Sequence, residues 1–506
     1  MAEMKYYTMQ EYVDVLQKRG MLTACELYGK EDTQIQNLTY NSKEVTEKTM
    51  FICKGAAFKP VYLRESVAAG AVCYISEKTF ELEEEVPYIL VADIRKAMSV
   101  LANMFYNNPW EDLHLVGVGG TKGKSTSVYY MKAIVDDYME ALDKKDSAVI
   151  SSIDIYDGKS KVESHITTPE AVELQQHLRN ALDCGMEYAQ MEVSSQALKY
   201  HRVDDMMFDV AIFLNISEDH ISPIEHADFE DYFSSKMLMF AKTKTAVVNL
   251  DADYIERILK EAQAAQEVLT FSTKDPSADF YAYNIRKDGG DTRFSVKCEA
   301  FDEEFVLTMP GLFNVENALG VIAAAVKFGI PKEYIHSGLL RARSSGRMEL
   351  YASKDRKILA IVDYAHNKLS FEKLFSSMKE EYPDYAIISI FGCPGKKALI
   401  RRRDLGTVAG QYSKKVYLVA EDPGYEPVED ISRDIAQYVE AQNCPYEMIE
   451  DRGEAIRDAI QTAEGKTLLL VTGKGGETRQ KYGCEYLDCP SDVEYVKKYL
   501  AEYDSK

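Results

Sequence analysis

Residues 115–126, Leu-Val-Gly-Val-Gly-Gly-Thr-Lys-Gly-Lys-Ser-Thr, constrain the fold of this chain more than any other segment. A short apolar run ends in glycines, Lys124 and Ser125 follow, and an amphipathic helix is expected from about residue 126. Such a strand-to-helix turn brings backbone N–H groups and the positive end of a helix dipole to one point. We therefore predict a phosphate-binding loop in which Lys124 reaches the β- and γ-phosphates and Ser125 ligates Mg²⁺. Val118 stands where the strict pattern has glycine, so a glycine-rich turn without a ligand is the alternative.

The chain is too long for a single hydrophobic core. Its 506 residues suggest about three domains. The Asn-Asn-Pro-Trp run at residues 107–110 is typical of a break between domains. We predict an α/β domain over residues 1–110, a central ATP-binding domain over 111–345 and a Rossmann-like domain over 346–506.

Two regions alternate continuous apolar runs with helical segments, a pattern typical of parallel sheets covered on both faces. The first region has such runs at residues 113–118, 148–151, 188–193, 210–214 and 246–250. Residues 269–309 are expected to be antiparallel, with a polar turn at 287–291 and an Ala-rich helix over 315–328. The alternation restarts with runs at residues 358–362, 386–391, 416–420 and 467–471. In such doubly wound units, ligands bind at the carboxyl ends of the strands.

Charge and composition restrict the class of protein. The formal net charge of −22 disfavours non-specific binding to nucleic acid or to an anionic membrane surface. No apolar run approaches the ~18–20 residues that span a bilayer. The nine cysteines include no C-x-x-C pair, which favours reduced thiols over a zinc site or a disulfide framework. We expect a cytoplasmic monomer that binds neither nucleic acid nor membrane.

Further motifs occur in a fixed order after the phosphate loop. They are the runs at residues 165–170 (HITTPE), 191–198 (MEVSSQAL), 215–220 (NISEDH), 232–236 (YFSSK), 310–317 (PGLFNVEN), 346–349 (GRME), 362–366 (VDYAH) and 473–477 (GKGGE). With the loop, this set resembles the Mur ligases of peptidoglycan synthesis, and most closely their tripeptide-forming (MurE-type) branch. The resemblance covers nearly the whole chain, including an N-terminal part similar to the UDP-binding domain of that family.

The resemblance implies a chemical reaction and its cofactors, ATP and Mg²⁺. The γ-phosphoryl group of ATP passes to the D-glutamyl carboxylate of UDP-N-acetylmuramoyl-L-alanyl-D-glutamate, which gives an acyl phosphate. An amino-acid amine then displaces phosphate. Phosphorylation is needed because a carboxylate has no leaving group of its own.

The resemblance also implies roles for individual residues. The catalytic and metal-binding candidates are Lys124, Ser125, Glu192, His220 and Lys236. Glu192 ends an apolar run, where a cleft is expected, although a solvated acid is its simpler explanation. A lysine ammonium has no lone pair for a metal, so Lys236 is expected to be carbamylated by CO₂; the alternative is an ordinary lysine on a helix face. The ATP-contacting candidates are Gly120, Thr121, Gly123, Lys124, Ser125, Thr126, Asn215, Asn314, Arg347 and Asp363; Asn314 could instead cap a helix.

The substrate-binding candidates fall into two groups. Those for the nucleotide-sugar peptide are Ser42, Thr167, Thr168, Ser194 and Arg202, and those for the amino acid and its surroundings are His366, Glu421, Asp422, Lys474 and Glu477. Ser42 lies in Asn-Ser-Lys where the family usually has Asp-Ser-Arg. Relatives that add meso-diaminopimelate carry Asp-Asn-Pro-Arg, whose arginine pairs with the extra carboxylate, but this chain has Glu-Asp-Pro-Gly at residues 421–424. Acidic residues here favour an ω-ammonium group, so L-lysine is the expected acceptor, with ornithine or meso-diaminopimelate as alternatives.

Two other functions stay open at this point. A folylpolyglutamate-synthase-like ligase would lack the roughly 110 residues that precede the phosphate loop here. A nucleotide-binding interaction protein without catalysis would keep the loop but have no need of Glu192, His220 and Lys236.

Overall fold

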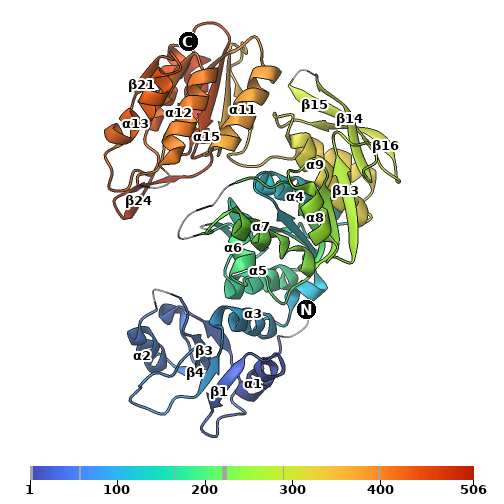
Figure 1. Cartoon of the computed structure of the whole chain (residues 1–506), viewed down its shortest axis with the longest axis vertical. Helices are drawn as coiled ribbons and strands as arrows, with labels where there is room; N and C mark the ends of the chain where they lie inside the picture. Colours follow the sequence, from blue (N-terminus) through green and yellow to red (C-terminus); the bar gives the residue numbers. More distant parts are fainter. Residues whose placement is uncertain are drawn as a thin grey trace. The chain divides into compact units, whose positions relative to one another are not determined.

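The computed structural model describes residues 4–55, 58–164, 166–218, 221, 225–288, 290–396 and 399–506. The chain divides into two compact units, and their helices and strands are drawn in Figure 1. The first consists of Met1–Phe271 with Ala323–Pro331, and the second of Ser272–Ile322 with Lys332–Lys506. Both are α/β, as the alternation of apolar runs and helices predicts. None of the described helices combines the length and the apolar character that crossing a membrane requires.

The N-terminal part of the first unit is a five-stranded sheet in the order β1-β5-β4-β3-β2. Its strands are β1 (Leu22–Glu26), β2 (Asn37–Thr39), β3 (Thr49–Ile52), β4 (Ala71–Ser76) and β5 (Tyr88–Val91), and its helices are α1 (Met9–Lys18), α2 (Pro60–Ala68) and α3 (Ile94–Phe105). Only the β1–β5 pairing is antiparallel. Helix α1 begins with a capping box from Thr8 and buries Tyr12 and Leu16 in the same core as Ile52 and Ile75.

The second sheet of this unit carries the phosphate loop. Its strands lie in the order β13-β12-β11-β6-β10-β7-β8-β9, and those from β13 to β7 are parallel. The bounds are β6 (His114–Gly119), β7 (Ala148–Ile150), β8 (Asp154–Tyr156), β9 (Lys161–Glu163), β10 (Tyr188–Glu192), β11 (Phe208–Phe213), β12 (Thr243–Asn249) and β13 (Glu267–Ser272). The helices are α4 (Lys124–Ala141), α5 (Ala171–Asp183), α6 (Ser195–Lys199), α7 (Phe229–Met237) and α8 (Ile255–Ala262). Because the strands are parallel, the segments after β6, β7, β10 and β11 meet at one edge.

The second unit begins with the antiparallel strands β14 (Phe280–Asp288), β15 (Asp291–Lys297) and β16 (Asp302–Leu307). Helices α9 (Asn314–Lys327) and α10 (Lys332–Arg341) follow along the chain. The expected antiparallel strands and Ala-rich helix are therefore confirmed, but residues 269–272 belong to β13, which is parallel to β12.

The rest of the second unit is a doubly wound sheet in the order β17-β18-β22-β19-β20-β21, parallel except for β17. Its strands are β17 (Glu349–Ala352), β18 (Ile358–Asp363), β19 (Ala386–Phe391), β20 (Lys415–Leu418), β21 (Tyr446–Met448) and β22 (Thr467–Thr472), and β23 (Arg479–Tyr482) and β24 (Glu485–Asp488) form a hairpin. The helices are α11 (Lys368–Glu381), α12 (Ile400–Tyr412), α13 (Val428–Glu440), α14 (Arg452–Gln461) and α15 (Asp492–Tyr503).

Candidate active site

The phosphate loop lies between β6 and α4, as predicted. Gly120 and Gly123 both adopt positive φ angles, +141° and +88°, which glycine reaches at little cost. Helix α4 begins at Lys124, two residues earlier than expected, so the N–H groups of its first turn face the loop. The Lys124 ammonium donates to the carbonyl oxygens of Gly120 and Thr121, each at 3.1 Å. The loop therefore has the form of an anion cradle at a helix N-terminus.

Two neighbouring glycines serve packing rather than the ligand. A Cβ on Gly117 would come within 2.8 Å of the Phe208 ring, and one on Gly119 within 2.6 Å of the Met239 sulfur. Both distances are too short for real contacts, so a larger residue at either position in β6 would displace a buried side chain.

Asn215, after β11, fixes the loop from the adjacent strand end. Its side-chain oxygen accepts from the Lys122 N–H at 2.9 Å, and its amide donates to the Lys122 carbonyl at 3.1 Å. Its own carbonyl accepts from the Thr121 N–H at 3.0 Å. Asn215, predicted to contact the nucleotide, thus binds the backbone of the phosphate loop and stabilises its conformation.

The two candidates for the first metal ion meet at a serine that the sequence did not single out. The Glu192 Oε1 atom, in a residue that is 1% exposed, accepts from the Ser152 N–H at 2.8 Å and from its hydroxyl at 3.0 Å. The same hydroxyl lies 3.1 Å from the Ser125 hydroxyl. Ser152 could have been found because it follows β7, whose end lies at the same edge as that of β10.

The oxygen-rich cluster of Ser125, Ser152 and Glu192 fits Mg²⁺, which prefers oxygen ligands. No described residue donates a hydrogen bond to the second carboxylate oxygen of Glu192. Among the described residues there is no group of three or more His, Cys, Asp and Glu side chains arranged for a metal. His220, the predicted ligand for a second ion, lies outside the described residues. The carboxylate and hydroxyl are therefore suited to an ion that keeps several water ligands, as Mg²⁺ does.

Lys236, on α7, reaches the phosphate loop. Its ammonium donates to the Gly120 carbonyl at 2.8 Å and lies 4.8 Å from the centre of the Tyr232 ring. The Tyr232 hydroxyl lies 3.0 Å from the Thr121 hydroxyl. The side chain is thus directed into the candidate site and is not the solvent-facing lysine of the simpler alternative.

The predicted substrate residues of the first unit gather beside Glu192. The Thr168 hydroxyl donates to the Glu192 carbonyl at 2.9 Å and accepts from the Ser194 N–H at 3.1 Å. Arg202 donates to the Thr168 carbonyl at 3.0 Å. Ser194 also caps α6 through the Ala197 N–H, so part of its role is structural. Thr167 precedes Thr168 and is half-buried.

A cluster of charges that the sequence did not reveal joins this group to the N-terminal sheet. Glu170 pairs with Arg202 at 2.8 Å and with Lys54, just after β3, at 2.5 Å. Burial opposes ionisation of Glu170, but the two cations outweigh it and hold its pKa below the usual range. Ser42 lies apart from this cluster, in the turn Ser42–Glu44, and donates to Glu65 at 3.3 Å.

In the second unit, another group of predicted residues follows the strand ends of the doubly wound sheet. Lys474, after β22, pairs with Asp422 at 3.0 Å and with Glu477 at 2.6 Å. The Tyr364 hydroxyl donates to Glu477 at 2.8 Å, and the Arg347 guanidinium lies 4.2 Å from the centre of the Tyr364 ring. These side chains form one connected network.

The remaining predicted residues of this unit have mainly backbone partners. Asp363 accepts from the N–H groups of Met348 and Ala365, at 3.0 and 2.8 Å. The His366 ring lies 2.8 Å from the Tyr364 carbonyl. Asn314 is the first residue of α9, so it is not the capping residue that the alternative expected before a helix from residue 315. Its side-chain amide donates to the Pro310 carbonyl at 2.7 Å.

The acidic cluster around residue 421 is largely neutralised. Asp422 is paired with Lys474, and Glu426 is paired with Arg402 at 2.7 Å. Glu421 is 9% exposed and has no hydrogen bond or ion pair with a described residue. Burial raises its pKa to about 7, partly offset by the positive charges of Arg452 and Lys474. A Cβ on Gly473 would come within 2.1 Å of its carboxylate, so a larger residue there would displace the Glu421 side chain.

Comparison with known proteins identifies the family. Residues 118–325 match the family described as Mur ligase middle domain, and residues 346–475 match the one described as Mur ligase, glutamate ligase domain. The chain is 36% identical over 466 residues to the UDP-N-acetylmuramoyl-L-alanyl-D-glutamate--L-lysine ligase of Enterococcus faecalis, covering 91% of this chain and 90% of that protein. The chain belongs to the Mur ligase family. This Mur ligase is also 36% identical over 501 residues to the protein of the same name from Streptococcus pyogenes, with 97% of the chain and 100% of that protein covered.

Solved structures share the fold of this Mur ligase. A UDP-N-acetylmuramoyl-L-alanyl-D-glutamate--2,6-diaminopimelate ligase superposes with a TM-score of 0.67 over 99% of each chain, at 21% identity. A folylpolyglutamate synthase of Mycobacterium tuberculosis superposes with a TM-score of 0.58, at 16% identity, and matches 92% of its own chain but 74% of this one. The expectation of a Mur ligase fold is confirmed.

Proposed function

We propose that this Mur ligase uses ATP to add L-lysine to the D-glutamyl carboxylate of UDP-N-acetylmuramoyl-L-alanyl-D-glutamate. Relatives named as L-lysine ligases for this substrate are 36% identical over nearly the whole chain. The observation that carries the proposal is the meeting of Lys124, Ser125 and Glu192 around one phosphate loop.

The chemistry brings two anions together, so it needs cations and N–H donors at the point of transfer. The first turn of α4 and the Lys124 ammonium receive the phosphate chain. Ser125 and Glu192 would hold Mg²⁺, which would neutralise charge on the phosphates. The bond between the γ-phosphorus and the β–γ bridging oxygen breaks, and a carboxylate oxygen of the D-glutamyl group bonds to that phosphorus. The amine then attacks the carbonyl carbon, loses a proton, and phosphate leaves with the carboxyl oxygen.

Lys236 enters this scheme as a carbamate. Its amine donates to the carbonyl of Gly120 in the phosphate loop, where the proposal places ATP. Loss of two protons and addition of CO₂ to the nitrogen would replace a positive ammonium by a negative carboxylate, which could ligate a second ion with His220. The N-terminal region, with Ser42, would hold the uridine end, while Thr167, Thr168, Ser194 and Arg202 would contact the sugar and peptide. We propose that these roles divide among domains at residues 1–110, 111–345 and 346–506.

The choice of lysine rests on the second unit. Asp422 and Glu426 are paired with cations, but buried Glu421 has no cation within hydrogen-bonding distance among the described residues. Its carboxylate can therefore bind an ω-ammonium group. Gly424 offers no guanidinium for the second carboxylate of meso-diaminopimelate.

A phosphate-release assay tests both parts of the proposal. The purified chain receives Mg-ATP, the UDP-muramoyl dipeptide and, in separate reactions, L-lysine, L-ornithine or meso-diaminopimelate. We expect phosphate release and a product of the mass of the lysyl tripeptide with L-lysine, and neither with Glu192→Gln. A preference for meso-diaminopimelate would reject the assignment of the acceptor, and the absence of any new amide product would reject the ligase itself.

A further inference from the structure

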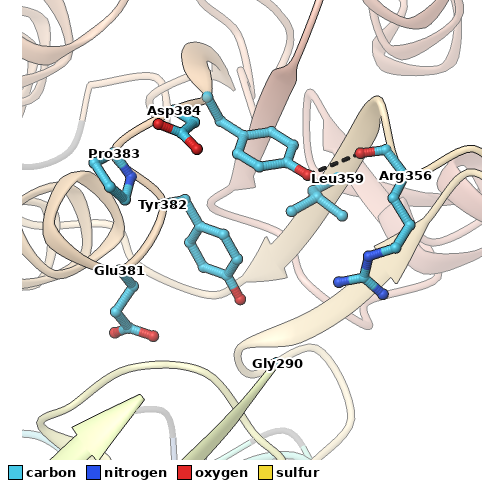
Figure 2. Close-up of a pocket in the computed structure, with 8 residues that line it drawn as sticks. Gly290, Arg356, Leu359, Glu381, Tyr382, Pro383 and Asp384 are labelled. Carbon is cyan, nitrogen blue, oxygen red and sulfur yellow. Dashed lines mark hydrogen bonds between the residues drawn. The ribbon is translucent and has the colours of Figure 1, made fainter. Parts of the chain in front are cut away.

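A cavity of about 460 Å³ opens in the second unit (Figure 2). It lies between Gly290, just before β15, the C-terminal end of α11, and the segment that enters β18. A volume of this size is typical of sites for small molecules. Among the described residues that line it, none is assigned above to ATP, metal or substrate.

One wall carries a hydroxyl without a partner. Tyr382 is 7% exposed, and its hydroxyl is buried with no hydrogen bond to any described residue. Burial, with the nearby Glu381 carboxylate, raises the pKa of this hydroxyl to about 12, so it stays protonated and remains a donor. A buried donor without an acceptor costs free energy, and it can be satisfied only by an acceptor that enters the cavity.

The opposite wall carries a cation without an ion pair. The Arg356 side chain forms no salt bridge with a described residue, although acidic residues outnumber basic ones by 22 in this chain. In Figure 2 its guanidinium and the Tyr382 hydroxyl point toward the same open space above Gly290. A guanidinium has donors only, so an oxygen acceptor that enters the cavity can bind to it as well as to the hydroxyl.

The acids at the cavity do not supply that partner. The Glu381 carboxylate is fully enclosed and is satisfied by Lys287 at 2.8 Å and by the N–H groups of Gly311 and Leu312. The Asp384 carboxylate lies 3.6 Å from the Lys466 ammonium. The charge that stays uncompensated on the wall is therefore positive.

We propose that this cavity is a binding site for a small anion that bears a carboxylate or phosphate group. The Arg356 guanidinium and the Tyr382 hydroxyl donate to its oxygens. Guanidinium groups bind both kinds of oxyanion through paired hydrogen bonds. None of the residues that line the cavity has a role in the proposed ligase reaction, so this proposal does not depend on the proposed function.

The full-length protein is tested by thermal unfolding in increasing inorganic phosphate or acetate, at constant ionic strength set with sodium chloride. We expect at least one of these anions to raise the Tm in a saturable manner. Arg356→Gln and Tyr382→Phe are expected to weaken its apparent affinity at least tenfold. The exposed, ion-paired Arg433 provides the matched control Arg433→Gln, which is expected to keep the effect. Whichever anion is effective identifies the preferred group.

Phosphate can also bind to the phosphate loop, and Lys124→Ala separates the two sites. A Tm shift that survives Lys124→Ala but is lost in both cavity variants supports the proposal. A shift that is lost in Lys124→Ala and kept in the cavity variants overturns it, as does the absence of any shift with either anion. Without added anion, Tyr382→Phe should be at least as stable as the wild type, because it removes an unsatisfied hydroxyl. Arg356 is exposed, so Arg356→Gln keeps the test valid even if Tyr382→Phe unfolds.

Discussion

Lys236 donates a hydrogen bond to the carbonyl oxygen of Gly120, at 2.8 Å, from a residue that is only 3% exposed. The contact ties helix α7 to the phosphate loop over 116 positions of sequence. An exposed lysine is the ordinary expectation for this residue type, and burying an ammonium group is costly. The position of this amine at the loop is therefore better explained by a role in the reaction than by the stability of the helix.

Replacement of Lys236 by alanine should lower kcat at least about 100-fold, the scale of losing one group that stabilises developing charge. The fold should be retained, because the helix keeps its Asp228 cap and its Tyr232 contact with the loop. Steady-state ligase assays and circular dichroism measure the two effects. Lys244→Ala, which removes an exposed lysine paired with Asp209, is the control. Partial recovery of turnover with added formate or acetate would support the carbamate, whereas wild-type turnover in Lys236→Ala would refute it.

The hydroxyl of Ser152 should control the response to Mg²⁺. In Ser152→Ala the backbone N–H still binds Glu192, but the hydroxyl that links Ser125 and Glu192 is lost. Loss of a partner of a metal ligand typically costs about 10–100-fold in metal affinity or activity. We expect the Mg²⁺ concentration for half-maximal activity to rise by about tenfold or more, measured at saturating ATP. Ser160→Ala, in the turn between β8 and β9, should leave it unchanged, and an unaltered Mg²⁺ curve in Ser152→Ala would exclude this role.

The central features could be predicted from the sequence because their signals are local. The strand, glycines, lysine, serine and helix of the phosphate loop follow one another within 30 residues. Buried parallel strands are recognised by continuous apolar runs, and β6, β10, β11 and β22 lie within a few residues of their predicted positions.

The remainder depends on contacts between distant segments or on weak local patterns. Strand β1 is largely exposed and therefore has no apolar run. Ser152 follows a strand of three residues, and Lys54 and Glu170 are 116 positions apart. Asp422 and its partner Lys474 are 52 positions apart in the sequence. The sequence therefore did not show that Asp422 is neutralised while Glu421 has no paired cation among the described residues.

The ion pair between Lys54 and Glu170 should matter for the nucleotide-sugar peptide rather than for ATP. Lys54→Met leaves Glu170 with Arg202 alone and removes the link between the N-terminal sheet and the proposed substrate residues. Removing one partner of a buried pair leaves the other charge poorly compensated. We expect KM for the UDP-muramoyl dipeptide to rise about tenfold, with KM for ATP changed less than twofold. Lys78→Met, an exposed lysine of the same region, is the control, and equal changes in both KM values would indicate a general loss of structure instead.

The stability of the second unit should depend on pH through Glu421. Burial raises the pKa of this carboxyl from 4.5 to about 7, so between these values the folded state binds more protons than the unfolded state. Unfolding free energy therefore falls as pH rises through this window, by at most about 3 kcal/mol at pH above 8. Glu421→Gln removes the charge and should be more stable than the wild type at pH 8.5, by about 2 kcal/mol, but nearly equal to it at pH 5.

Urea unfolding of both proteins at pH 5 and pH 8.5 measures this difference. Glu429→Gln, which removes an exposed acid paired with Arg433, should show no such dependence on pH, because exposed pairs contribute about 0–1 kcal/mol. Glu421→Gln should also raise KM for lysine. The carboxylate that it removes destabilises the folded state at high pH, but in the proposal it binds the ω-ammonium group of the acceptor. An equal stability difference at the two pH values would show that Glu421 is already ionised or already compensated in the folded protein, and the basis for choosing lysine would then be lost.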